Sequence, residues 1–473
     1  RYIVYPLMVI FGLSETEWLQ TTTTHVMEST GKNYAKLMQI FSLIPNSMQY
    51  EPNDQIGIPW DLNKIAQLLF FIALSATVVG LICARTKAKR WWTGGLGLLL
   101  SAVLLTGYFI PVSVPVMDLS AASETADTTY YGMNYKDCQK DEAADFRVKK
   151  YQLDFSVGLN LTGLAKVYVD RSELKSYRFT LYHGYKVKQV TDQTGAALDF
   201  RREYDYVTVT RGGAAVEYLC LEYTGKSPKY YSSYAGVCLP ANFAYYPIPG
   251  YRELFKDNFY GFIDCSLPYD TAFDVRCSGR KQMYCNLAAR GDNHFAGNAR
   301  SITLLSGYYD TLKLNDTLVV YPKYADGEIQ ARVKKNMGTF TKEHRDIHTI
   351  FIMDADNLTP YEHLRSYDGY VVTNSMIDME QSYFESQIDI SKMDFYKTFV
   401  YYYNEKVDRE ELEQLKQSED PEEYPMVQII LKLSASKNRE AAAAETEQYL
   451  TNSKDTRAPM TFLQELGEKY AKA

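Results

Sequence analysis

Two long apolar stretches, 65–84 and 93–112, dominate the pattern of polar and apolar positions, and neither contains a charge. Each has about 20 residues, and a helix of that length crosses the roughly 30 Å hydrocarbon core of a bilayer. The short segment between them carries four basic residues, Arg85, Lys87, Lys89 and Arg90. Short loops rich in Lys and Arg stay on the cytoplasmic side. The pattern predicts a transmembrane hairpin over 64–116, with a cytoplasmic loop at 85–92 and all later residues outside the cytoplasm.

Tryptophans stand at the ends of these stretches, where aromatic side chains meet the interface of a bilayer. They are Trp60, Trp91 and Trp92. Upstream, residues 2–13 are apolar over about half the length of a span. We therefore expect 1–63 to comprise the end of a truncated membrane helix and an extracytoplasmic loop.

Short runs of alternating polar and apolar residues replace the long apolar stretches after about residue 147. In the first run the apolar positions are Tyr151, Leu153, Phe155 and Val157, and similar runs follow at 205–210 and 216–223. Period-2 runs separated by turn residues are typical of antiparallel sandwiches. The pattern predicts a β-sandwich over 147–322, preceded by a linker at 117–146 that is rich in small and acidic residues.

The pattern becomes mixed, then helical, over 323–473. A helix is predicted at 327–338 and buried strands at 349–353 and 369–373. Apolar residues then recur at helical spacing, predicting four helices at 407–417, 424–434, 439–450 and 460–470. The predicted fold class is therefore multidomain: a transmembrane hairpin, an all-β sandwich and a shortened C-terminal domain that passes from α/β to α-helical.

Composition narrows the choice of partners. The net charge is −7, which argues against a nucleic-acid partner because such proteins present a basic face. The 41 tyrosines among 473 residues suit half-buried strands and broad surfaces. A cluster in the strand region is a candidate interaction surface, or else an edge loop packed on a neighbouring domain: Tyr230, Tyr231, Tyr234, Tyr245 and Tyr246.

Seven cysteines occur, and none forms a CxxC pair of the kind that binds zinc. Cys83 lies in the first apolar stretch and is interpreted as a packing residue. The other six are in the predicted exported part: Cys138, Cys220, Cys238, Cys265, Cys277 and Cys285. An even number outside the cytoplasm permits three disulfides with 15 connectivities. The alternative is that these residues are free buried thiols.

The strand segments together resemble a known family. YQLDFSVGLNLTGLAKVYVD (151–170), VEYLCLEYTGK (216–226) and NFAYYPIPG (242–250) are similar, in order, to segments of the N-terminal domain of the M1 (aminopeptidase N) metallopeptidases. RFTLYHGYKVKQVTDQTGAALDF, FIDCSLPYDTAFDVRCSG and ITLLSGYYDTLKLNDTLVVYP extend the series. The resemblance covers about 147–322 and continues more thinly to about 380.

The resemblance implies a thermolysin-like catalytic domain, which carries HExxH and GxMEN in that family. In HExxH, two histidines on one helix face ligate zinc and the Glu activates water. This chain has neither motif; its nearest segment is HRDIH at 344–348, with Arg345 in the place of the Glu. We therefore predict no catalytic residue, no metal and no cofactor. The alternative is an active metallopeptidase that uses His344, His348 and a distant Glu362 or Glu380. The isolated His183, His294 and His363 are interpreted as packing or surface residues.

The order of spans, sandwich and shortened catalytic remnant resembles bacterial ABC-2-type permeases fused to an aminopeptidase-like extracytoplasmic domain. This resemblance implies a separate ATPase subunit, because the chain has no Walker A motif. The leading hypothesis is a non-catalytic, multi-pass cell-membrane protein, the C-terminal part of an exporter permease. Its partners would be the lipid bilayer, the ATPase and an extracytoplasmic peptide or protein. The alternatives are a membrane-anchored M1-type zinc aminopeptidase and a peptide- or cell-wall-sensing module.

Overall fold

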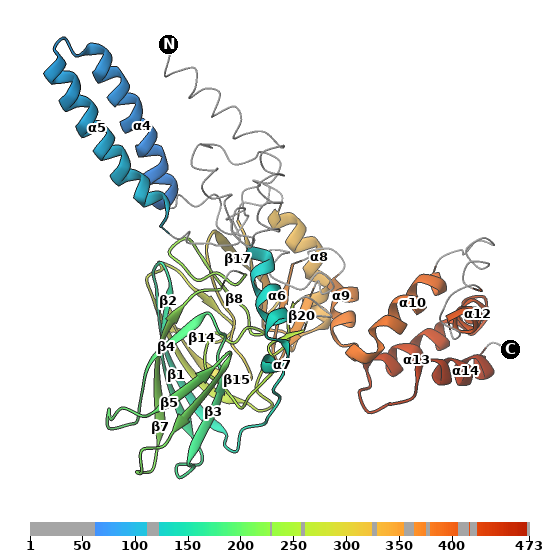
Figure 1. Cartoon of the computed structure of the whole chain (residues 1–473). Helices are drawn as coiled ribbons and strands as arrows, with labels where there is room; N and C mark the ends of the chain where they lie inside the picture. The colour runs from blue at the N-terminus through green and yellow to red at the C-terminus, as the bar shows by residue number, and fades with distance from the viewer. Residues whose placement is uncertain are drawn as a thin grey trace. The chain divides into compact units, whose positions relative to one another are not determined.

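A computed structural model describes residues 62–110, 123–227, 229–256, 261–323, 329–353, 364–374, 379–404, 416 and 423–470 (Figure 1). The chain has a mixed α/β, multidomain fold, divided into two compact units, Arg1–Ile377 and Asp378–Ala473. The predictions for 1–61, which include Trp60, lie outside the described residues, and so does almost all of the predicted helix at 407–417.

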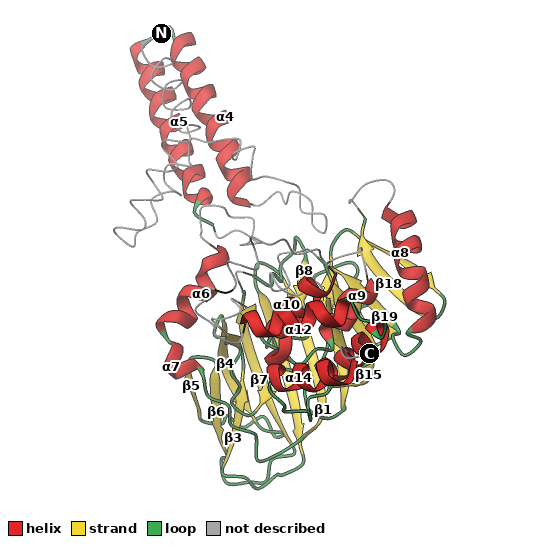
Figure 2. Cartoon of the chain, turned by 90° about the vertical axis from the view of Figure 1, so that its right-hand side faces the viewer, coloured by secondary structure: helices red, strands yellow, loops and turns green. Residues whose placement is uncertain are grey.

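Two helices, α4 (Leu62–Cys83) and α5 (Lys87–Tyr108), form the predicted hairpin and lie side by side in both views (Figures 1 and 2). Both are long and apolar enough to cross a membrane. Their connection spans only 84–86 and is shorter than the predicted loop at 85–92. The reason is a cap: the Thr86 side chain accepts a hydrogen bond from the Lys89 amide at 3.3 Å, so the helix begins at Lys87.

Small residues let α4 and α5 approach closely. A β-carbon added at Gly97 would lie 2.1 Å from Thr77 Oγ1, and one at Gly107 would lie 2.7 Å from Ala66 Cβ. By contrast, a β-carbon at Gly95 would have no atom within 4 Å among the described residues. Close backbone approach at small residues is the usual basis of helix packing inside a bilayer.

Replacing Gly97 with isoleucine is expected to push the two helices apart, because the new side chain would overlap Thr77. Spin labels on the exposed Leu69 and Leu100, introduced as cysteines with Cys83 replaced by serine, report the separation by pulsed electron resonance. We expect a longer or broader distance distribution in Gly97→Ile. The matched control Gly95→Ile should keep the wild-type distribution, and a shift of equal size in both variants would contradict the packing described here.

The sandwich is built on a seven-stranded sheet in the order β14-β15-β12-β1-β2-β7-β4. Its strands are β1 (Val148–Val157), β2 (Leu161–Val169), β4 (Tyr185–Thr191), β7 (Tyr218–Gly225), β12 (Thr271–Ser278), β14 (Ala288–Gly291) and β15 (His294–Ala299). A four-stranded sheet, β5-β6-β3-β9, shares its core. Its strands are β5 (Phe200–Glu203), β6 (Tyr206–Thr210), β3 (Ser176–Thr180) and β9 (Ile248–Pro249).

The predicted alternation in the first strand is confirmed, since its apolar positions, Tyr151, Leu153, Phe155 and Val157, are all buried. The larger sheet is not wholly antiparallel as predicted, because β1 pairs with β12 in parallel. This pairing joins segments more than 100 residues apart in the sequence, which a local pattern does not specify.

A second sheet of five strands, in the order β17-β18-β19-β21-β20, follows the sandwich. Its elements are β17 (Tyr309–Leu314), β18 (Thr317–Pro322), α8 (Ile329–Glu343), β19 (Thr349–Ile352), β20 (Leu364–Tyr367) and β21 (Tyr370–Thr373). Because β18 pairs in parallel with β19, β17 and β18 belong to this α/β layer, and the predicted boundary at 322 falls inside it. One face of α8 is buried, and its side chains are Val333, Met337 and Phe340.

Short strands lie beside these sheets. They are β8 (Val237–Leu239), β13 (Tyr284–Cys285) and β16 (Leu304–Ser306), which form a three-stranded sheet, and the pair β10 (Phe255–Lys256) and β11 (Gly261–Phe262). Leu305 of β16 and Cys238 of β8 share a core with Phe351 and Tyr370 of the five-stranded sheet. Residues 237–306 therefore contribute to the packing between the sandwich and the α/β layer.

The second unit is helical. Its elements are α9 (Met379–Ser386), a 3-10 turn (Ile390–Lys392), α10 (Met393–Asn404), α12 (Glu423–Ser434), α13 (Arg439–Thr451) and α14 (Pro459–Tyr470). The last three confirm predicted helices to within two residues. The buried Lys392 ammonium donates to the Tyr449 and Asn452 carbonyls, at 2.7 and 2.8 Å, at the end of α13. Cations stabilise helix C-termini, so Lys392 ties the 3-10 turn that precedes α10 to the end of α13.

The predicted linker at 117–146 contains two helices, α6 (Ser123–Met133) and α7 (Tyr135–Cys138). Tyr131 and Cys138 are 3% and 4% exposed and belong to the core of the sandwich. The segment predicted as a linker therefore contains helices, at least one residue of each of which is buried in the core of the sandwich. Among the described side chains of α6, Tyr130 and Tyr131 pack on this core, and two adjacent aromatic residues give no helical period.

Candidate functional site

The basic residues of the hairpin, Arg85, Lys87, Lys89 and Arg90, are all exposed at or next to the reversal. Trp91 and Trp92 follow them and are 83% and 80% exposed. Apolar side chains such as Ile82, Leu96 and Leu99 cover the outside of the two helices. An apolar surface of this extent is abnormal for a protein facing water, and it has the chemistry to contact lipid acyl chains or other membrane helices.

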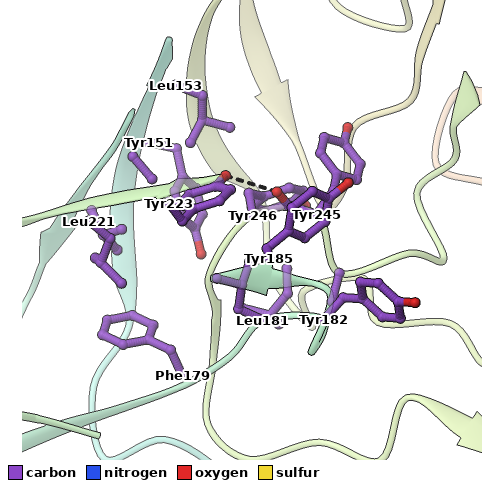
Figure 3. Close-up of a cluster of buried hydrophobic side chains, with 14 of the residues drawn as sticks. Tyr151, Leu153, Phe179, Leu181, Tyr182, Tyr185, Leu221, Tyr223, Tyr245 and Tyr246 are labelled. Carbon is purple, nitrogen blue, oxygen red and sulfur yellow. Dashed lines mark hydrogen bonds between the residues drawn. The ribbon is translucent and has the colours of Figure 1, made fainter. Parts of the chain in front are cut away.

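Four of the five tyrosines predicted to form an interaction surface lie in the core instead, and Figure 3 shows two of them, Tyr245 and Tyr246. Tyr230, Tyr231, Tyr245 and Tyr246 are at most 1% exposed, and only Tyr234 is half-buried. Figure 3 shows the Tyr223 hydroxyl donating to the backbone of Tyr245, at 2.8 Å. The Tyr245 hydroxyl donates to the Ile302 carbonyl at 2.8 Å, and burial raises its pKa well above the ordinary value. Backbone acceptors let these rings be fully buried.

The seven cysteines are all free in the structure, so the three disulfides permitted by the sequence are not formed. Cys138, Cys238, Cys265 and Cys285 are buried, and Cys220 and Cys277 are half-buried. Burial raises the pKa of Cys265 and of Cys285 to about 12. A thiol in such surroundings stays protonated and packs as a small apolar side chain. The arrangement is that of free buried thiols.

The segment 344–348 lacks the helical geometry that a HExxH-type site requires. Helix α8 ends at Glu343, and a turn at 345–346 separates His344 from His348. The His344 ring packs on Phe340 with centroids 4.4 Å apart, whereas the His348 amide donates to the Gly369 carbonyl at 2.7 Å beside β19. The two histidines therefore do not share one helix face. Glu362 lies outside the described residues, and Glu380 belongs to the second unit.

A buried group of ionisable side chains, which sequence reasoning missed, lies where α6 meets the sandwich. We call it the acid–histidine cluster and define it as Asp127, His183 and Asp205. Asp127 comes from α6, His183 from the turn between β3 and β4, and Asp205 from the turn between β5 and β6. Both turn residues stand at chain reversals between strands of the structure, and no periodic pattern in the sequence brings them together.

The His183 ring lies between the two carboxylates. Its Nε2 is 3.8 Å from Asp127 Oδ1, and its Nδ1 is 3.4 Å from Asp205 Oδ1. The Tyr182 hydroxyl donates to Asp127 at 2.6 Å, and the His183 amide donates to Asp205 at 2.6 Å. Tyr130 of α6 stacks on the imidazole with centroids 3.5 Å apart. His183 is thus a packing residue, as predicted, but one held between two acids.

Burial controls the charge of the cluster. Asp127 and Asp205 are 4% and 1% exposed. Loss of hydration raises the pKa of Asp127 to about 6, against the lowering effects of the Tyr182 hydrogen bond and of His183. The Oδ2 atoms of both acids are buried without a hydrogen-bond partner among the described residues. The nearby Arg202 guanidinium donates to the carbonyls of Leu181 and Tyr182, both at 2.9 Å.

A metal ion does not fit the cluster. The two carboxylates face opposite nitrogens of one ring, so an ion bound at either nitrogen would reach only one of the acids. Metal sites instead gather their ligand atoms around one point. A proton on Asp127 does fit, because it removes a buried negative charge from a carboxyl whose Oδ2 has no hydrogen-bond partner among the described residues.

Comparisons with known proteins give a distant likeness in fold. No protein-family profile matches the chain, and no curated protein is significantly similar to it in sequence. Among solved structures, native yeast LTA4 hydrolase is 11% identical, with a TM-score of 0.36 over 53% of this chain, which spans 46% of that protein. The yeast enzyme in complex with bestatin gives 11% identity and a TM-score of 0.39, covering 71% of this chain and 65% of the other.

The M1 zinc metallopeptidase from Deinococcus radiodurans is also 11% identical, with a TM-score of 0.36 over 70% of this chain and 89% of that one. These likenesses are distant, since all three TM-scores lie below 0.5.

Proposed function

We propose that the chain is a non-catalytic component of a membrane transport complex, the C-terminal part of an ABC-type exporter permease. The hairpin α4–α5 lies in the cell membrane, the basic reversal faces the cytoplasm, and the sandwich binds or assembles with a peptide or protein outside. A separate subunit supplies ATP hydrolysis. The observation that carries this proposal is the hairpin itself: two uncharged apolar stretches, closely packed through glycines, with an apolar outer surface.

Two features support the non-catalytic part of the proposal. The sequence contains no HExxH, and its nearest substitute, 344–348, is split by the end of α8. A water-activating Glu is missing there too, because Arg345 takes its place. Without the shared helix face and this base, the zinc-bound water mechanism has no counterpart at these residues.

Zinc stoichiometry and peptidase activity test the proposal. The full chain, purified in detergent and equilibrated in zinc buffers set by a chelator, is expected to hold far less than one zinc per chain. It is also expected to hydrolyse aminoacyl reporter substrates no faster than the variant His344→Ala. Tight one-to-one zinc, together with hydrolysis that His344→Ala abolishes, would establish the rival membrane-anchored aminopeptidase.

The transport part needs its own measurement. Material purified from native membranes in mild detergent is expected to carry ATPase activity, which this chain cannot provide without a Walker A motif. In the control protein, an unrelated two-span hairpin replaces 62–108 and the remainder is unchanged. If the control retains the same ATPase activity, or if neither preparation has any, the permease assignment fails.

A further inference from the structure

Helix α6 is fixed to the sandwich by one face that carries both aromatic and ionisable groups. Asp127, Tyr130 and Tyr131 are spaced i, i+3 and i+4, so they lie together on that face. Tyr131 stacks on Phe255, with centroids 4.7 Å apart and planes 4° from parallel. The apolar ring contacts do not depend on pH, but the charge of Asp127 does, so the attachment of α6 has one component that depends on protons.

We propose that the acid–histidine cluster is a proton-operated latch: with its extra proton it holds α6 against the sandwich, and loss of that proton weakens the attachment. Helix α6 is the first described element after the hairpin in the sequence. The latch thus makes the connection between membrane segment and sandwich sensitive to acidity. This inference does not depend on the chain being a permease.

The number of protons that the cluster holds explains this behaviour. A neutral imidazole has one N–H and can donate to one acid, so its other nitrogen turns a lone pair toward the second carboxylate. These contacts are 3.4 and 3.8 Å long and neither is a hydrogen bond, so one further proton, on Asp127, acts by removing a buried negative charge. Removing it leaves two buried carboxylates whose close donors, the Tyr182 hydroxyl and the His183 amide, are uncharged, and each acid keeps one oxygen without a hydrogen-bond partner among the described residues. Buried charges without a partner are costly, and undocking α6 relieves that cost by exposing Asp127 to water.

The surrounding charges do not replace this proton. Tyr182, His183, Asp205 and Lys229 act on Asp127, and only Lys229, from the loop after β7, brings a fixed positive charge. Arg202 lies near Asp205, but its guanidinium donates to backbone carbonyls. The pKa of Asp127, which burial raises from 3.8 to about 6, supports the same direction of the effect: docking of α6 weakens as the pH rises. A raised pKa means that docking is strongest below about pH 4 and is lost as the pH rises through about 6.

Hydrogen exchange of the α6 amides, in the full chain in detergent, measures the latch. Rates at pH 5 and pH 7.5 are corrected for intrinsic exchange, and β1 amides serve as the internal reference for a folded sandwich. The raised pKa of Asp127 corresponds to corrected exchange of the α6 amides that is about tenfold faster at pH 7.5 than at pH 5. In Asp127→Asn, whose amide keeps the hydrogen bonds of the neutral acid, this ratio should fall to about one.

A second histidine–acid pair in the same domain gives the control. His294 Nε2 is 2.9 Å from Asp274 Oδ1 on β15 and β12, away from the α6 contact. Asp274→Asn should therefore retain the full pH ratio in α6. The latch is overturned if wild-type α6 exchanges equally at the two pH values, or if the ratio persists in Asp127→Asn while the β1 amides show that the sandwich is folded.

Discussion

Replacing Tyr245 with alanine is expected to lower the free energy of unfolding of the sandwich by about 3–5 kcal/mol, the range for deleting a buried aromatic ring. The Tyr245 ring is 0% exposed, packs edge-on against Tyr246 with centroids 5.1 Å apart, and donates to Ile302. Hydrogen exchange of β1 amides measures the loss, because Phe155 of β1 also contacts this ring. Tryptophan fluorescence would not report it, since all four tryptophans lie before residue 93.

Two further variants separate the packing of Tyr245 from its hydroxyl. Tyr245→Phe keeps the ring but removes the donor to Ile302, and should cost about 1–2 kcal/mol. Tyr234→Ala, in the same stretch of chain but half-buried, should cost less than about 1 kcal/mol. If Tyr245→Ala left β1 protection unchanged and instead reduced binding of an extracytoplasmic partner, the interaction-surface interpretation of this tract would be restored.

The tyrosines show why a local pattern could not predict their role. A hydroxyl at a chain position with many polar neighbours resembles a surface residue, and the partners that allow burial are remote in sequence. The Tyr245 hydroxyl donates to the Ile302 carbonyl, 57 residues away in the sequence. Sequence reveals that a tyrosine needs an acceptor, but only the fold brings the acceptor within reach.

Elements whose burial follows a period within one segment were predictable. The strand β1 and the helices α4, α12, α13 and α14 each carry their own apolar pattern, and their bounds lie within a few residues of the predictions. Helix α6 has no such pattern, because most of its residues are small or polar and its attachment rests on side chains of two distant turns. The same property hid the acid–histidine cluster, whose three members come from positions 127, 183 and 205.

Removing the four positive charges beside the hairpin reversal, by Arg85→Gln, Lys87→Gln, Lys89→Gln and Arg90→Gln, is expected to place the sandwich on both sides of the membrane. Lys and Arg near the ends of spans set orientation, whereas acidic residues contribute little. At the opposite end of the hairpin, Lys64 is the one basic residue within 37–84, and none occurs over 91–135. Without the four charges, the excess of basic residues at the reversal that sets the orientation of the hairpin disappears, and roughly half of the chains should insert in the opposite orientation.

Protease digestion of a C-terminal tag in sealed vesicles of known orientation measures this distribution. Because α4 and α5 lie side by side, residues 62 and 108 are at the same end of the hairpin, opposite the reversal at 84–86, so a hairpin that spans the membrane enters and leaves it on one side. The control neutralises four exposed lysines far from the spans, Lys342, Lys432, Lys437 and Lys454, with the same change in net charge. It should leave the tag extracytoplasmic. A wild-type tag found on the cytoplasmic side would reverse the assigned topology, and with it the placement of the sandwich outside the cell.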